Sequence, residues 1–206
     1  MALTAGAYGL RPVGRVGSVP YTGGTVRQYR LTADNDVAIY TNGVVVCVAG
    51  AINGGDLTPV AGTLDAQSPI GVCTGVQYTD PVLKYTLNAQ YLPANAITAG
   101  YTNILVSVID DPETLFMVQA NTAVTQASIG LNAPLLTLTG SATTGLSAIT
   151  IGSIAVTSTL AVKIVDLVNQ NSIFGGNPAS APGDAYTDCI VKWNFQVHKY
   201  LAGLGV

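Results

Sequence analysis

Three acids that lie close together are the first residues whose types and spacing could do chemistry. In the segment VIDDPETLFMVQA (108–120), Asp110, Asp111 and Glu113 fall within four positions, in a chain that has 11 acids in total. Such a cluster could bind a cation or act as a general acid and base if its oxygens converge. Adjacent residues of an extended chain point to opposite faces, however, and Asp111-Pro112 suits the first two positions of a turn. We therefore predict a hairpin turn here, and rank an enzyme using these acids last.

The other residues whose side chains could do chemistry are isolated in the sequence. Asp34 and Asp36 have the spacing that begins a calcium loop, but the glycine and the glutamate that complete such a loop are missing. His198 is the only histidine. The three cysteines lie in separate apolar runs and are expected to be structural thiols: Cys47, Cys73 and Cys189. We predict no catalytic residues, no metal site and no cofactor, and so not an enzyme.

The composition indicates a protein that works in an assembly. Of its 206 residues, 49% are hydrophobic and only 9% are charged, whereas charged residues usually make up about 25% of a globular domain. A free-standing protein normally covers its surface with charge. We therefore expect much of this surface to lie against partners, including further copies of the chain.

Charge is distributed unevenly along the chain. Residues 1–33 carry four arginines and no acid, a formal charge of +4, and the remainder carries four lysines and 11 acids, or −7. This asymmetry is typical of a terminal segment that docks on an acidic surface, and equally of a few solvated arginines in a poorly ordered terminus. The basic residues of this segment are too sparse, and the remainder of the chain is too acidic, to favour nucleic acid as a partner. No secretory signal and no run of about 18 apolar residues is present, so we expect no membrane partner.

The elements that must position these residues are strands. Alternating or β-branched runs at 26–32, 37–40, 43–50, 70–80, 84–92, 101–109, 114–120, 160–168 and 189–198 are separated by turn residues. Asn42-Gly43 predicts a hairpin between the second and third runs. The pattern indicates an all-β fold, a β-sandwich or β-barrel (jelly-roll-like topologies included), with an extended N-terminal arm. We expect the arm over 1–25 and the β-rich body over 26–206, in which 121–160 could be a Thr/Ser/Ala-rich insertion or lobe.

Several segments, in this order, resemble those of a family of tailed-bacteriophage head proteins that act as capsid decoration or cement proteins. These segments are AGAYGLRPVG, YTGGTVRQYRLT, IGVCTGVQYTDPVLKYTLNAQYLPA, VIDDPETLFMVQA and GDAYTDCIVKWNFQVHKY. The resemblance covers about residues 6–200 and is weakest over 121–165. The family has no catalytic residues to carry over.

The resemblance implies a structural virion protein, assembled in the cytoplasm of the host bacterium and placed on the exterior of the icosahedral head. There it would bind the major capsid protein, stabilise contacts between its subunits, and form a homo-oligomer, a trimer or a dimer. The expected contact residues are those of the basic arm and the first strand: Arg11, Pro12, Arg15, Pro20, Tyr21, Arg27 and Arg30. The rival interpretation is a carbohydrate-binding β-sandwich module exposed on a virion or a cell, using its tyrosines and the 169–185 loop.

Overall fold

The protein is built almost entirely of strands. The structure, a computed structural model, describes residues 6–17, 19–20, 26–31, 33, 35, 37–48, 51–53, 69–136, 140–168 and 183–194. Every pair of named strands is antiparallel. In the described ranges the one helical element is a 3₁₀ turn at Gln126–Ser128. The predicted all-β class is confirmed.

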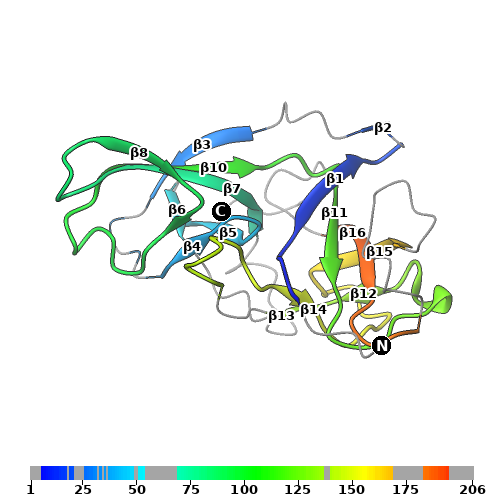
Figure 1. The fold of residues 1–206 in the computed structure, drawn as a ribbon. Coiled ribbons are helices and arrows are strands. Elements are labelled where there is room, and N and C mark those ends of the chain that lie inside the picture. The colour runs from blue at the N-terminus through cyan, green and yellow to red at the C-terminus, as the bar shows by residue number, and fades with distance from the viewer. Residues whose placement is uncertain are drawn as a thin grey trace.

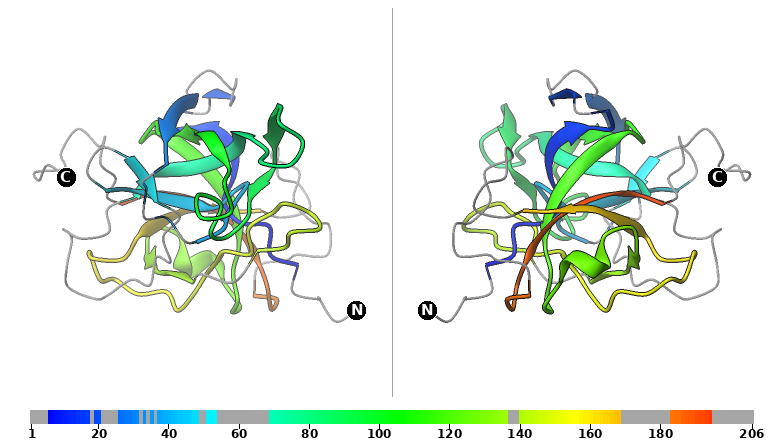
Figure 2. Two further views of the ribbon diagram at one scale, coloured as in Figure 1. Left: turned by 90° about the vertical axis from the view of Figure 1, so that its left-hand side faces the viewer. Right: turned by 90° about the vertical axis from the view of Figure 1, so that its right-hand side faces the viewer.

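The first sheet has six strands in the order β12-β15-β16-β11-β1-β2. Their bounds are β12 Asn132–Ala133, β15 Val162–Leu167, β16 Asp188–Trp193, β11 Thr114–Gln119, β1 Arg11–Arg15 and β2 Val19–Pro20. β1, β11 and β16 run side by side in the right-hand view of Figure 2. The run 160–168 is thus a strand, as its β-branched residues predict.

The second sheet has the order β3-β10-β7-β5-β6, and β8 pairs with β7. Their bounds are β3 Val26–Arg30, β10 Thr102–Ile109, β7 Pro69–Thr79, β5 Val44–Val48, β6 Ala51–Asn53 and β8 Thr86–Ala89. The sheet curls, because β3 and β6, at opposite ends of this order, come into contact. Figure 1 shows this sheet beside the steeper strands of the first sheet. Two small pairs complete the fold, β4 (Ile39–Tyr40) with β9 (Tyr91–Leu92) and β13 (Leu135–Leu136) with β14 (Thr150–Ile151).

Three clusters of buried hydrophobic side chains follow from the alternation along the strands: two large cores, and a small cluster of Leu115, Met117, Val168 and Ile190. In β5, Val44 and Val46 face a core shared with the first sheet, whereas Val45 faces a core enclosed by the second sheet. In the shared core, Phe116 and Trp193 meet edge to face with their centroids 6.0 Å apart, a contact that adds about 1 kcal/mol to the burial of the two rings. Because both sheets contribute to the shared core, they form a β-sandwich.

Residues 121–160 contribute to this shared core as well. Its members from that region are Val124, Ala133, Leu135, Ile149 and Ile151, all almost completely buried. Their burial places this region against the sandwich.

The acidic segment forms a turn, but the predicted hairpin is wrong. The amide of Thr114 donates to the carbonyl oxygen of Asp111 at 3.2 Å, which closes the turn. β10 before it pairs with β3 and β7, and β11 after it pairs with β1 and β16. The turn therefore carries the chain from the second sheet into the first. The hairpin predicted at Asn42-Gly43 is wrong as well. The strands on its two sides do not pair with each other, because β4 pairs with β9 and β5 pairs with β6 and β7.

Within the predicted arm (1–25), the described residues 11–15 are extended, but they do not form an arm free to lie along another protein. They are β1, which pairs with β11 within the same chain. Leu10 is completely buried in the shared core, and the Tyr8 hydroxyl donates to Asp188 on β16 at 2.9 Å. The free energy gained by burying Leu10 and pairing β1 inside the chain outweighs the turn-like Gly and Pro content of the segment.

One glycine shows how closely β7 and β10 approach each other. A Cβ on Gly71 would overlap the backbone carbonyl of Ile109, whereas one on Gly75 would find its nearest neighbour, the oxygen of Ala89, at 3.5 Å. The sequence run 70–80 predicted such an approach or a bulge from its two glycines. Both occur, since the register with β10 also shifts between Cys73 and Gly75.

We expect Gly71→Ala to lower the free energy of unfolding by about 3 kcal/mol, because the new methyl group forces the two backbones apart. The matched control Gly75→Ala, on the same strand, should change it by less than about 0.5 kcal/mol. Urea denaturation of both variants measures the difference, and equal midpoints would contradict the close approach.

Candidate functional site

The acidic turn binds its own chain on both sides. Asp110 is 5% exposed, and its Oδ2 lies 3.3 Å from Nε of Arg27 on β3. The hydroxyl of Tyr29, also on β3, donates to the same oxygen at 2.7 Å. Asp111 points the other way, with its Oδ2 2.8 Å from Nε of Arg15 on β1. Adjacent acids of an extended chain do diverge here, as the sequence predicts.

The strand register explains these pairings. Arg15 stands opposite Thr114, the first residue after the turn, and Val26 stands opposite Ile109, the last residue of β10. The end of β1 and the start of β3 therefore flank the turn. The backbone amide of Val16 also donates to the carbonyl of Glu113 at 2.9 Å.

The arrangement supports structure better than chemistry. Burial, reinforced by the hydrogen bond and the charge of Asp110, raises the pKa of Tyr29 to about 12, so its hydroxyl remains a donor at neutral pH. Asp111 uses its Oδ1 to accept the amide of Glu113 at 3.0 Å, which fixes the turn. Because Asp110 and Asp111 diverge toward different strands, their oxygens do not converge on one point.

The predicted partner-binding residues lie in several different settings. Arg15 and Arg27 make ion pairs within the chain, although their side chains are 43% and 67% exposed. Arg11 and Arg30 are exposed on β1 and β3, and Pro12 is half-buried. Pro20 belongs to β2, and Tyr21 lies outside the described residues.

A second surface, which sequence reasoning missed, lies on the loop between β7 and β8. Val82, Leu83 and Tyr85 are 83%, 53% and 53% exposed. Asp80 holds this loop with its Oδ1, which accepts the amides of Val82 and Leu83, each at 2.8 Å. The available signal was the pair Val82-Leu83 placed in a turn, where polar residues are the rule. We call residues 80–85 the apolar loop.

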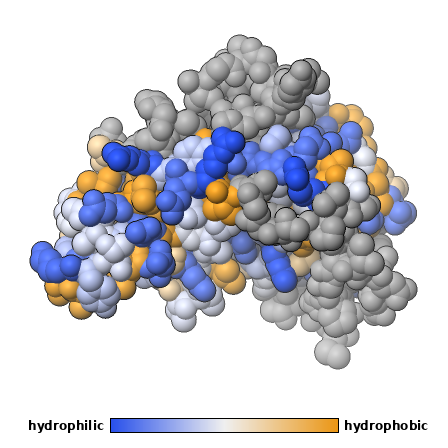
Figure 3. Space-filling view, turned by 90° about the horizontal axis from the view of Figure 1, so that it is seen from above, coloured by the Kyte–Doolittle hydropathy of each residue, from blue (hydrophilic) through white to orange (hydrophobic). Residues whose placement is uncertain are grey.

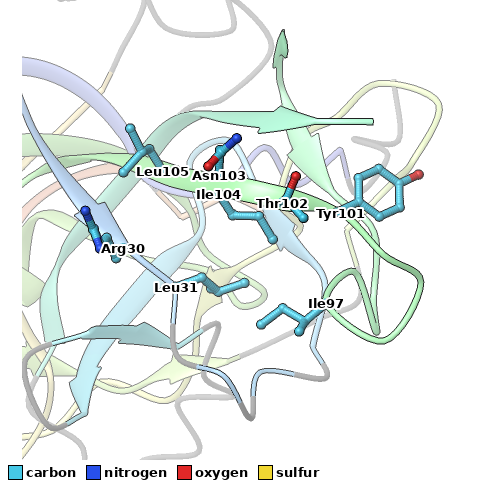
Figure 4. A pocket seen from close by; sticks show the side chains of 8 residues that line it. All are labelled: Arg30, Leu31, Ile97, Tyr101, Thr102, Asn103, Ile104 and Leu105. Carbon is cyan, nitrogen blue, oxygen red and sulfur yellow. The ribbon is translucent and has the colours of Figure 1, made fainter. Parts of the chain in front are cut away.

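Next to the apolar loop lies a pocket of about 400 Å³, at the end of β3 and the start of β10. Figure 4 shows Leu31, Ile97 and Ile104 turned toward one another, with Arg30 to one side. Tyr101, Thr102, Asn103 and Leu105 complete the lining. Asn103 has a positive φ of 52° and lies where the register between β10 and β7 shifts, an irregularity that re-aims side chains.

The buried cysteines and the remaining acids that the structure describes do not form a second candidate site. Burial raises the pKa of Cys73 and of Cys189 to about 12, so both remain neutral thiols at physiological pH. Within the described residues, no group of three or more His, Cys, Asp or Glu side chains is placed to hold a metal ion. Asp34, Asp36 and His198 lie outside those residues.

Comparisons with known proteins give no relative from which a function could be carried over to this chain. No family model, no curated protein and no solved structure matches the chain. A search for helices suited to crossing a membrane, over the same described ranges, finds none.

If the acidic turn is structural, Asp111→Ala should lower the free energy of unfolding by about 1–2 kcal/mol, because it removes the turn hydrogen bond and leaves Arg15 without its carboxylate. The control Glu113→Ala changes an exposed acid in the same turn and should cost less than about 0.5 kcal/mol. Thermal and urea unfolding measure both, and equal losses would contradict this role for Asp111.

Proposed function

We propose that the chain is a structural virion protein that decorates the outer surface of an icosahedral head and strengthens contacts between major capsid protein subunits. The observation that carries the proposal is a surface suited to permanent contact. From Pro81 to Ile109 the only charged residue is Lys84, and within this stretch the apolar loop exposes three large hydrophobic side chains. Surfaces of this kind are typical of interaction sites.

The physical task of such a protein is to add buried area across the seams of a shell. A specific contact buries about 1,600 Å² in total. Several weak contacts made by one copy become effectively permanent, because each bound contact raises the effective concentration of the next. A poorly charged exterior on a rigid β-sandwich suits this task, since little desolvation of charge opposes binding.

The best-placed basic residues for shell carboxylates are the two exposed arginines that make no ion pair within the described part of the chain. Arg11 and Arg30 are exposed on β1 and β3, whereas Arg15 and Arg27 already pair with Asp111 and Asp110. The proposal therefore assigns electrostatic contacts to Arg11 and Arg30, and apolar contacts to the region around the apolar loop.

A carbohydrate-binding module is the second candidate. Tyr85 is 53% exposed and Tyr101 lines the pocket, and exposed aromatic side chains can stack on sugar rings. A glycan array separates the two candidates: saturable binding of one glycan class, lost in Tyr101→Ala, supports the module.

The decoration role predicts that purified particles contain the chain in a copy number comparable to that of the shell subunit, measured by quantitative mass spectrometry. Arg11→Glu with Arg30→Glu should lower that copy number several-fold, because each substitution places a carboxylate against an acidic surface. Lys163→Glu, the same change of charge sign on β15, serves as control. Absence of the chain from particles would contradict the proposal.

A further inference from the structure

Two tyrosines stack on the outward side of the small β4–β9 pair. Tyr40 and Tyr91 stand directly opposite each other, with ring centroids 5.8 Å apart and planes 12° from parallel. Their strand neighbours Ile39 and Leu92 are buried in the core enclosed by the second sheet. Because successive side chains of a strand point to opposite faces, the two rings point away from that core. Both are half-buried and belong to none of the hydrophobic clusters of the described residues, so core filling does not explain the stack.

The segment 140–146 forms a turn that holds this stack in place. Backbone hydrogen bonds close the turn, and the amide of Thr41 on the β4 side donates to the Gly145 carbonyl at 3.0 Å. The turn lies beside β4 in Figure 1. A Cβ on Gly140 would lie 2.6 Å from two ring carbons of Tyr40, so the backbone of the turn packs against that ring. Rings held in this way lose little conformational entropy when a ligand binds.

Neutral polar side chains border the two rings. Gln90 is exposed, and its Oε1 lies close enough to Gly145 that a Cβ built there would be 3.1 Å away. Ser141, Thr143 and Thr144 of the turn are exposed as well. A side-chain amide and a hydroxyl can each donate and accept hydrogen bonds. The stack is therefore edged by groups that can bind the hydroxyls of a ligand in either sense.

The segments that build this surface carry no charge. No Asp, Glu, Lys, Arg or His occurs in 37–55, 85–109 or 114–162, which contain all of the residues named above. The face seen from above in Figure 3, which β3 crosses, differs in having strongly hydrophilic groups between hydrophobic ones, and β3 itself carries Arg27 and Arg30. A charged ligand on the tyrosine stack would lose water without gaining a counter-charge. The surface therefore favours a neutral ligand.

A saccharide combines the two kinds of group that this surface can bind. The C–H face of a pyranose ring packs on an aromatic ring, and its hydroxyls hydrogen-bond to amide and hydroxyl side chains. A protein partner would find little apolar area here. Among the described residues, the large hydrophobic side chains that are exposed include none from 88–93 or 140–147, whereas the centre of a protein interface is rich in them.

We propose that the stack of Tyr40 and Tyr91, with Gln90 and the turn 140–146, is a binding site for a neutral saccharide built of hexose units. The site goes beyond the decoration role, and it is separate from Tyr85 and Tyr101, the residues of the carbohydrate-binding candidate above. None of its residues is among those assigned to the shell. Binding is measured on the isolated chain, so its failure is distinct from absence of the chain from particles.

Titration calorimetry of the full chain with neutral oligosaccharides of glucose, galactose and mannose tests the site. We expect at least one of them to bind saturably with a dissociation constant below about 1 mM. Tyr91→Ala should raise that constant at least about tenfold, whereas Tyr91→Phe, which keeps the ring, should change it by less than about threefold. Gln90→Ala removes an exposed amide and should raise it about fivefold.

Tyr85→Ala is the matched control, because Tyr85 is an exposed tyrosine outside the site, and it should leave the dissociation constant unchanged. Circular dichroism checks that every variant is folded, and Gln90→Ala decides if Tyr91→Ala is not. Three results would each overturn the proposal. They are no binding of any neutral oligosaccharide, equal binding by the wild type and these two variants, and binding that is lost in Tyr101→Ala but kept in Tyr91→Ala.

Discussion

Two adjacent carboxylates hold the point where the chain leaves one sheet and enters the other. Asp110 binds β3 of the second sheet through Arg27 and Tyr29, and Asp111 binds β1 of the first sheet through Arg15. A nearly buried carboxylate without these partners would be costly. The pairings therefore constrain the end of β1 and the start of β3 as well as the turn. The shared core beneath contains residues of both sheets.

This constraint changes where binding is expected. The N-terminal arginines suggested a basic arm that docks on a partner's acids, but two of the four find acids within their own chain. Among the described residues, exposed apolar side chains gather at one end of the second sheet, where the apolar loop and the pocket are neighbours, and the proposed function places apolar contacts there. An interface there depends on shape and burial of apolar area more than on charge, which is consistent with a chain that has only 9% charged residues.

Strands and turns could be predicted from the sequence, but their partners could not. Asp80-Pro81, Asn42-Gly43 and Asp111-Pro112 all mark reversals, yet of these only the first joins two strands that pair with each other, β7 and β8. Turn chemistry decides the local dihedral angles, whereas strand pairing depends on residues far apart in the chain. Tyr29 and Leu31, two residues apart, pack against the core enclosed by the second sheet. The pocket could not be foreseen, because it joins β3 to the distant start of β10.

The central claim is that the acidic turn couples the two sheets into one cooperative unit. Native-state hydrogen exchange tests it most directly, by comparing amides of β7 and β10 with amides of β11 and β16 in the wild type and in Asp110→Asn with Asp111→Asn. Our account predicts that both sets exchange with the same free energy and that both fall by the same amount, about 2–3 kcal/mol, in the variant. A loss confined to one sheet would contradict it.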